Sequence, residues 1–152
     1  MGYNLNEITI RTNNTTDGMK KIEEIWNDIT TGKLPILFDS EHNFLQGISP
    51  VSRYSNYASD EKGDYDLSIM GVTAEFFGQM ELEVSKGHYI KYDESDESGN
   101  IGLCTKKAWE KVWNDQKNGA IKRTFTADYE SSVPAQYTKD GKAHCYLYIA
   151  VQ

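Results

Sequence analysis

The sequence has few cysteines and lacks a long hydrophobic run. Its 152 residues include two cysteines, Cys104 and Cys145. Two are too few for the disulfide framework of a small secreted domain, so we expect both thiols to be reduced packing residues. The apolar runs are only a few residues long, which excludes a membrane-spanning helix. The first residues carry neither a basic nor an apolar stretch, so we expect no signal peptide and predict a cytoplasmic protein.

Several motifs with a defined chemistry are also missing from the sequence. It has no glycine pattern of a phosphate-binding loop and no G-x-S-x-G elbow of a serine hydrolase. His42, His88 and His144 have no histidine or cysteine at metal-ligand spacing, so we predict neither a metal site nor a cofactor. The acidic run at residues 93–97 lacks the glycine of a calcium loop and is interpreted as a solvated turn. A net charge of −7 argues against direct binding of nucleic acid.

The composition is that of an ordinary globular domain. Hydrophobic residues make up 38% of the chain and charged residues 26%, and a chain of this length buries enough surface to fold without disulfides or metal. We therefore expect a single domain, residues 1–152. Ten tyrosines are more than packing alone usually requires. Tyrosine suits recognition surfaces, because its ring buries area with little loss of rotamer freedom.

The sequence contains an internal repeat. When it is shifted by 87 residues, seven positions of the segment 20–38 are identical to the segment 107–125, where unrelated sequences would share about one. We interpret the chain as two related units, about 1–78 and 79–152. The identical positions are Lys20, Glu23, Trp26, Asn27, Asp28, Gly32 and Phe38, which match Lys107, Glu110, Trp113, Asn114, Asp115, Gly119 and Phe125.

Each unit is predicted to contain one amphipathic helix. In the first, apolar residues recur at helical spacing over residues 19–29, with cap candidates at 15–17 and Gly32 as the stop signal. Trp26 and Trp113 are expected to lie in the core. In the second unit the apolar stripe is Ala108, Trp109, Val112 and Trp113, with Asn100 or Thr105 as the cap and Gly119 as the stop signal.

Strands are predicted on both sides of each helix, so that each unit has the order strand, helix, strand, strand. In the last strand, residues alternate between an apolar face and a face with two tyrosines. The predicted strands are 7–11, 44–54 and 67–76 in the first unit and 80–92, 124–130 and 145–151 in the second. The apolar face of the last strand has Cys145, Leu147, Ile149 and Val151, and the opposite face has His144, Tyr146 and Tyr148.

The predicted fold class is α+β. We expect two βαββ modules related by a pseudo-twofold axis, with a mainly antiparallel sheet and both helices on one face. The opposite face is then lined by Tyr, Met and Phe from alternate strand positions. A groove between two related halves is a common place for a small molecule to bind, so we predict a ligand groove on this face.

One segment places a carboxylate beside an aromatic ring, at Tyr129 and Glu130. Ring faces attract positive charge through the ring quadrupole, and a buried carboxylate in an aromatic pocket supplies the counter-ion. Such a pocket selects flat, lipophilic cations. From the spacing alone two interpretations are open: Glu130 is this counter-ion, or it is the solvated end of an exposed strand.

Four segments together resemble the GyrI-like effector-binding domain family. They are residues 84–92 (VSKGHYIKY), 108–113 (AWEKVW), 128–130 (DYE) and 146–151 (YLYIAV). The family comprises ligand-binding domains of transcription regulators, gyrase-inhibitory proteins and stand-alone forms. The resemblance implies a groove for bulky aromatic, often cationic, compounds, with a buried glutamate as counter-ion in multidrug-binding members. By position that glutamate is Glu130.

The predicted function is therefore a stand-alone effector or multidrug-binding module for lipophilic, aromatic cations. A role in transcription would need a separate DNA-binding chain as partner, because the sequence has no helix-turn-helix. Trp109 is included as a wall because its counterpart in the repeat, Ile22, is aliphatic. The predicted ligand-binding residues are Glu130 as counter-charge and Tyr89, Trp109, Tyr129, Tyr137, Tyr146 and Tyr148 as stacking walls.

Two alternatives are left open by the resemblance. Some GyrI-like proteins are hydrolases that open the cyclopropane ring of DNA-alkylating natural products. In that case Glu130 would be the catalytic residue, either as an acid or as a carboxylate that steers water, with Tyr89, Tyr146 or Tyr148 of the same pocket. The other alternative is a gyrase-inhibitor-like interaction protein, whose acidic surface mimics the charge of DNA. Whether the protein is an enzyme is thus left open, and binding without turnover is the preferred interpretation.

Overall fold

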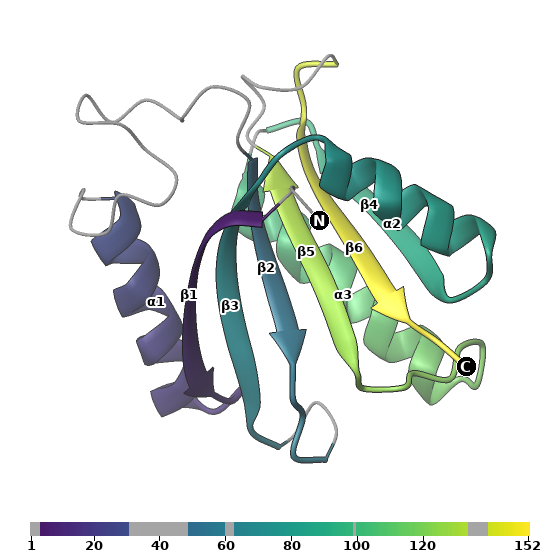
Figure 1. Ribbon diagram of the computed structural model, residues 1–152, viewed down its shortest axis with the longest axis horizontal. Helices are drawn as coiled ribbons and strands as arrows, with labels where there is room; N and C mark the ends of the chain where they lie inside the picture. Colours follow the sequence, from purple (N-terminus) through teal and green to yellow (C-terminus); the bar gives the residue numbers. More distant parts are fainter. Residues whose placement is uncertain (1–3, 31–48, 60–62, 99, 134–139) are drawn as a thin grey trace. The chain divides into compact units, whose positions relative to one another are not determined.

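The computed structural model describes residues 4–30, 49–59, 63–98, 100–133 and 140–152, with side chains described at all of these except 4–7, 29–30, 49–50 and 133 (Figure 1). These residues form six strands and three helices, so the α+β class is confirmed. The chain divides into two compact units, Met1–Gln79 and Met80–Gln152. The boundary lies one residue beyond the predicted end of the first repeat.

The first unit contains β1 (Asn4–Thr12), α1 (Thr16–Thr30), β2 (Ser49–Ser55) and β3 (Tyr65–Val72). β3 lies between β1 and β2 and pairs with both in antiparallel register (Figure 1). Its residues are buried on both sides, as expected of a central strand. One face packs against α1 and forms a core from buried Tyr65, Leu67 and Ile69 with partly buried Ile22, Ile25 and Trp26.

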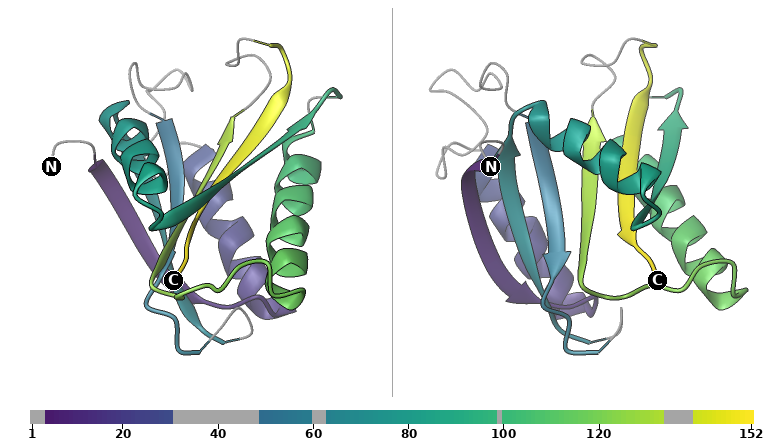
Figure 2. Two further views of the ribbon diagram at one scale, coloured as in Figure 1. Left: turned by 90° about the vertical axis from the view of Figure 1, so that its right-hand side faces the viewer. Right: turned by 45° about the vertical axis from the view of Figure 1, so that its right-hand side comes forward.

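The second unit contains β4 (Tyr89–Asp96), α3 (Ile101–Lys117), β5 (Ala127–Val133) and β6 (Ala143–Ala150). β6 pairs in antiparallel register with β4 on one side and β5 on the other. α3 covers one face of these strands (Figure 2). The core under it contains Cys104, Ala108 and Val112 of the helix together with Cys145, Leu147 and Ile149 of β6.

The two units share the order strand, helix, strand, strand, and in each the third strand pairs with both others. The faces of β6 were predicted correctly, because Cys145, Leu147 and Ile149 pack in the α3 core. Both cysteines are buried and free, as expected. Burial raises the pKa of the Cys145 thiol to about 12, so this thiol stays protonated at neutral pH. A pseudo-twofold relation between the units stays a prediction.

Of the strand predicted over 80–92, residues 89–92 belong to β4 as predicted, but the first part is wrong. The strand predicted over 67–76 also ends earlier, at Val72. Residues 80–84 belong to a helix, α2 (Glu75–Ser85), which contains the boundary between the two units. The strand prediction used the alternation of Met80, Leu82 and Val84. The buried residues are Phe76 and Met80, four apart as on one side of a helix, while Leu82 is 47% exposed. The period of burial is therefore helical. None of the described helices is long and apolar enough to cross a membrane.

Both ends of α3 have a residue that the sequence predicts for them, and of the two cap candidates, Asn100 and Thr105, Asn100 is the N-cap. The side chain of Asn100 accepts a hydrogen bond from the backbone N–H of Leu103 at 3.0 Å. Beyond the last turn, Gly119 has a φ of +77°, which an L side chain rarely adopts. The prediction that Trp113 is a core residue is wrong, because its side chain is 42% exposed. It lies beside the buried row of Ala108 and Val112 and not on it.

We predict that the Asn100→Ala variant loses about 1 kcal/mol of unfolding free energy, because a backbone N–H of the first turn of α3 loses its acceptor. Urea denaturation followed by circular dichroism measures this loss. Asn118→Ala is the matched control at the other end of α3, where the backbone of Asn118 makes the capping bonds, and it should change stability by less than about 0.5 kcal/mol. Equal losses in both variants would contradict the capping role.

Candidate functional site

The register of β5 against β6 decides which side chains of the second unit can meet. Residues directly opposite on neighbouring strands lie on the same face of a sheet. Glu130 lies opposite Leu147, so it is on the face covered by α3. Tyr129 lies opposite Tyr148, and Ser131 lies opposite Tyr146. Those tyrosines are therefore on the other face, away from Glu130.

On the α3 face, Glu130 is held by a tryptophan. The indole Nε1–H of Trp109 donates a hydrogen bond of 2.6 Å to Oε1 of Glu130, and both side chains are half-buried. The ring of Trp113 lies one helical turn further along, 6.1 Å from that of Trp109 and tilted by 31°. This ring is 42% exposed. We call these three residues the tryptophan–glutamate site.

A buried ion pair packs against the ring of Trp109. Arg123 donates to Oδ2 of Asp128 at 2.7 Å, and the two side chains are 1% and 0% exposed. The other oxygen of Asp128 accepts the backbone N–H of Ala150 at 2.9 Å, which ties the start of β5 to β6. The guanidinium also lies 5.8 Å over the ring of Trp109 and 4.4 Å over that of Phe125. The indole that orients Glu130 is thus itself held in place.

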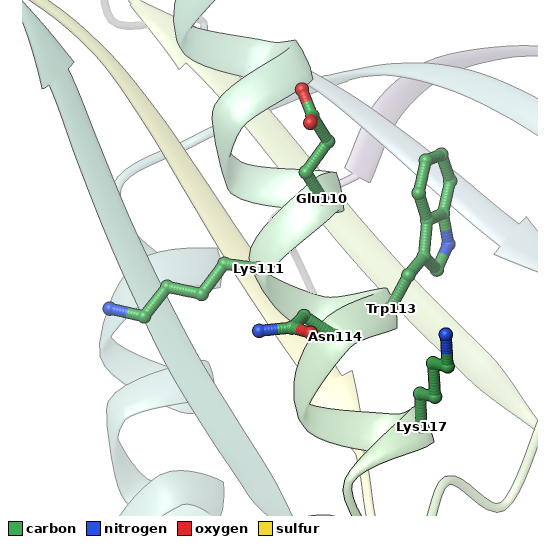
Figure 3. A pocket seen from close by; sticks show the side chains of 5 residues that line it. All are labelled: Glu110, Lys111, Trp113, Asn114 and Lys117. Atoms are coloured by element: carbon green, nitrogen blue, oxygen red, sulfur yellow. The ribbon is translucent and has the colours of Figure 1, made fainter.

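An open depression on the outer surface of α3 adjoins the site at Trp113. Its described lining consists of side chains from this helix (Figure 3). Trp113 and Lys117 extend from the same side of the helix, and Lys111 points to the other side. Glu110 lies towards the N-terminal end of the helix and Lys117 towards its C-terminal end. The lining residues are Glu110, Lys111, Trp113, Asn114 and Lys117.

The opposite face of these strands is rich in tyrosines whose hydroxyls bond to the protein itself. Tyr89 donates to the carbonyl of Ala127 at 2.9 Å, and Tyr148 donates to Glu81 at 3.2 Å. Lys91 donates to the same carboxylate at 2.7 Å and lies 5.7 Å over the ring of Tyr148. The hydrogen bond from Lys91 lowers the pKa of Glu81, and burial raises the pKa of Tyr148.

His144 is clamped between two carboxylates on this face. Its Nδ1 is 2.8 Å from Asp93 and its Nε2 is 2.7 Å from Asp140. A neutral imidazole can donate from one nitrogen only, so both bonds require the imidazolium form. The hydrogen bond to Asp93 and, after it, that to Asp140 raise the pKa of His144, against the opposing effect of burial. The ring stacks on Tyr146 at 5.4 Å, and this arrangement joins β4 to the turn before β6.

The structure thus divides the predicted site residues between two faces. It brings together Glu130 and Trp109, but the predicted grouping of Glu130 with the tyrosines in one pocket is wrong. The cause is the two-residue period of the strands, which places neighbours such as Tyr129 and Glu130 on opposite sides. Tyr137 lies outside the described residues. The residues on the opposite face are Tyr89, Tyr129, Tyr146 and Tyr148.

Sequence reasoning missed three residues of this region. No role was predicted for Arg123 or for the side chain of Asp128. Their opposite charges, five residues apart around the start of a predicted strand, could have indicated an ion pair. Trp113 was assigned to the core, although its offset from the row of Ala108 and Val112 indicated exposure. In the described part of the chain, no group of three His, Cys, Asp or Glu side chains could hold a metal ion.

Comparison with known proteins adds a likeness of fold. No protein-family model matches the chain, and no curated protein matches it either. A solved structure, an integron cassette protein from the mobile metagenome of Vibrio cholerae, is similar with a TM-score of 0.61 and 20% sequence identity. The match covers 99% of this chain and 96% of the other. At this identity the likeness shows a shared fold alone.

We predict that Asp128→Asn lowers the unfolding free energy by on the order of 3 kcal/mol, because the buried guanidinium of Arg123 loses its counter-charge. Urea denaturation measures the loss. Asp66→Asn is the exposed counterpart, since Asp66 is 28% exposed and pairs with Arg11 at 3.2 Å, and it should cost less than about 1 kcal/mol. A loss in Asp128→Asn no larger than in this control would contradict a supporting role for the buried pair.

We also predict that His144 stabilises the fold more at acidic than at basic pH. The pKa of His144 is raised in the folded state. Its stabilisation of the fold is therefore fully present below the pKa in the unfolded state, about 6.5, and is lost as the pH rises through the pKa in the folded state. The destabilisation by His144→Gln should be on the order of 1 kcal/mol larger at about pH 5.5 than at about pH 9. His88→Gln is the control, because His88 has one carboxylate partner, Glu83 at 2.6 Å. A difference of opposite sign would refute the clamp.

Proposed function

We propose that the protein is a stand-alone module that binds bulky, lipophilic, aromatic cations, with Glu130 as the counter-ion. The observation that carries this proposal is the tryptophan–glutamate site, in which the indole N–H of Trp109 holds a half-buried carboxylate. A second indole, that of Trp113, stands 6.1 Å away and is 42% exposed. An acid and ring faces are the two elements that recognition of a flat cation requires.

The local physics favours a cation over a neutral or anionic ligand. A carboxylate that is partly removed from water attracts a positive charge more strongly than one in bulk solvent. The hydrogen bond from Trp109 fixes one oxygen of Glu130 before a ligand arrives, which reduces the ordering cost of binding. Arg123 forms its short ion pair with Asp128 at 2.7 Å, so this acid offsets the charge of the guanidinium beside Trp109.

The proposal changes the predicted binding surface in one respect. Its aromatic walls are the indoles of Trp109 and Trp113, and it does not use the tyrosines of the opposite face. Membership of the GyrI-like family remains part of the proposal, since the comparisons bear on the fold alone. The name of the integron cassette protein mentions no ligand or activity. The hydrolase and gyrase-inhibitor alternatives stay predictions.

The test is the binding of a cationic rhodamine ester, measured by fluorescence polarisation. Glu130→Gln keeps the shape of the side chain and an oxygen that can accept from Trp109, but it removes the negative charge. We predict that the Kd for this dye rises about tenfold, which corresponds to about 1.4 kcal/mol, while the Kd for a neutral aromatic dye stays the same.

Glu97→Gln serves as the control for net charge, because Glu97 is 87% exposed. It should leave the Kd of both dyes unchanged. An equal Kd for the cationic dye in wild type and Glu130→Gln would refute the assigned role of the carboxylate. A similar weakening of both dyes by Glu130→Gln would indicate a loss of structure and not of charge recognition.

A further inference from the structure

Along α3 the side chains beside the tryptophan–glutamate site change from acidic to basic. Trp109, Trp113 and Lys117 follow one another at four-residue spacing, so they lie in one row on the helix surface. At the start of this row Trp109 is bonded to the Glu130 carboxylate, and at its end stands the Lys117 ammonium group. Figure 3 shows Trp113 and Lys117 extending from the same side of the helix.

Two lysines border the depression, and the structure distinguishes them. Lys111 points to the far side of α3 from Trp113 and forms an ion pair with Glu94 at 3.8 Å (Figure 3). Lys117 lies beside the exposed indole and, among the described residues, takes part in no salt bridge. Of the two amines, Lys117 is therefore the one that can meet a group on a ligand stacked against Trp113.

The acidic groups lie towards the opposite end of the row. Glu130 bonds to Trp109, and Glu110 borders the depression at its N-terminal end. From Trp109 to Lys117 the helix rises about 12 Å, at about 1.5 Å per residue. A surface with carboxylates at one end, two indoles in the middle and an amine at the other complements a ligand with separated charges.

We propose that the site takes flat aromatic zwitterions, in which the cationic end meets Glu130, the ring system lies against Trp113 and an anionic group meets Lys117. This inference rests on the proposed function, because the cationic end is bound by the same carboxylate. It adds a second polar contact, which sets the direction in which the ligand lies. Lys117 is then a residue that determines specificity between zwitterions and simple cations.

The test compares two dyes that differ in one group, tetraethylrhodamine with a free carboxylate and its ethyl ester. Wild type should bind the carboxylate dye about threefold more tightly than the ester, the size expected for one exposed ion pair. Lys117→Gln should abolish this preference without changing the Kd of the ester. Lys111→Gln makes the same change of charge on the same helix and should keep the preference.

The outcomes separate this inference from the proposed function. If wild type binds both dyes equally and Glu130→Gln still weakens both, the zwitterion inference is overturned and the proposed function stands. If Lys111→Gln and Lys117→Gln reduce the preference for the carboxylate dye alike, its cause is the electrostatic field of the whole protein. The contact with Lys117 is then refuted. If neither dye binds, both proposals fall. Loss of the preference in Lys117→Gln alone, with the preference of Lys111→Gln kept, supports the contact.

Discussion

The register of β5 against β6 is the constraint on which the chemistry of the second unit depends. With Glu130 opposite Leu147, the carboxylate meets α3 and the indole of Trp109. A shift by one residue would move it to the tyrosine face and bring Tyr129 under the helix. The register is held by more than the ladder itself, because Asp128 accepts the N–H of Ala150 and is tied by Arg123. The buried ion pair and the position of the acid are parts of one arrangement.

The polar side chains on the face of these strands away from α3 are bonded to one another, as between Lys91, Tyr148 and Glu81. Elsewhere, Tyr92 donates to Asp115 and Tyr65 donates to Asn14. These bonds give the tyrosines a structural use that the composition alone does not reveal. A high tyrosine content is therefore weak evidence for a binding surface when the hydroxyls have partners within the protein.

Much of the architecture was predictable, because it depends on local patterns. Helix α3 follows from its apolar row, its cap at Asn100 and the glycine at 119, and the two faces of β6 follow from strict alternation. Helix α2 was not predicted, since an alternation over 80–84 outweighed the helical spacing of Phe76 and Met80. Short apolar runs fit both periods, and burial, which a sequence does not display, decides between them.

The site was predictable only in part, because it depends on contacts between residues that are far apart in the sequence. The sequence identifies Glu130 and Trp109 as candidates, but the hydrogen bond between them joins residues 21 positions apart on different elements. The face on which each side chain lies depends on the register and not on composition. The same reasoning explains why Trp113 was misplaced. A tryptophan beside an apolar row can lie in the core or outside it, and here it is left exposed next to a ring that the protein already uses to hold an acid. An exposed indole costs free energy in water, and a flat ligand that covers it would recover this cost while meeting the charges at the two ends of the row.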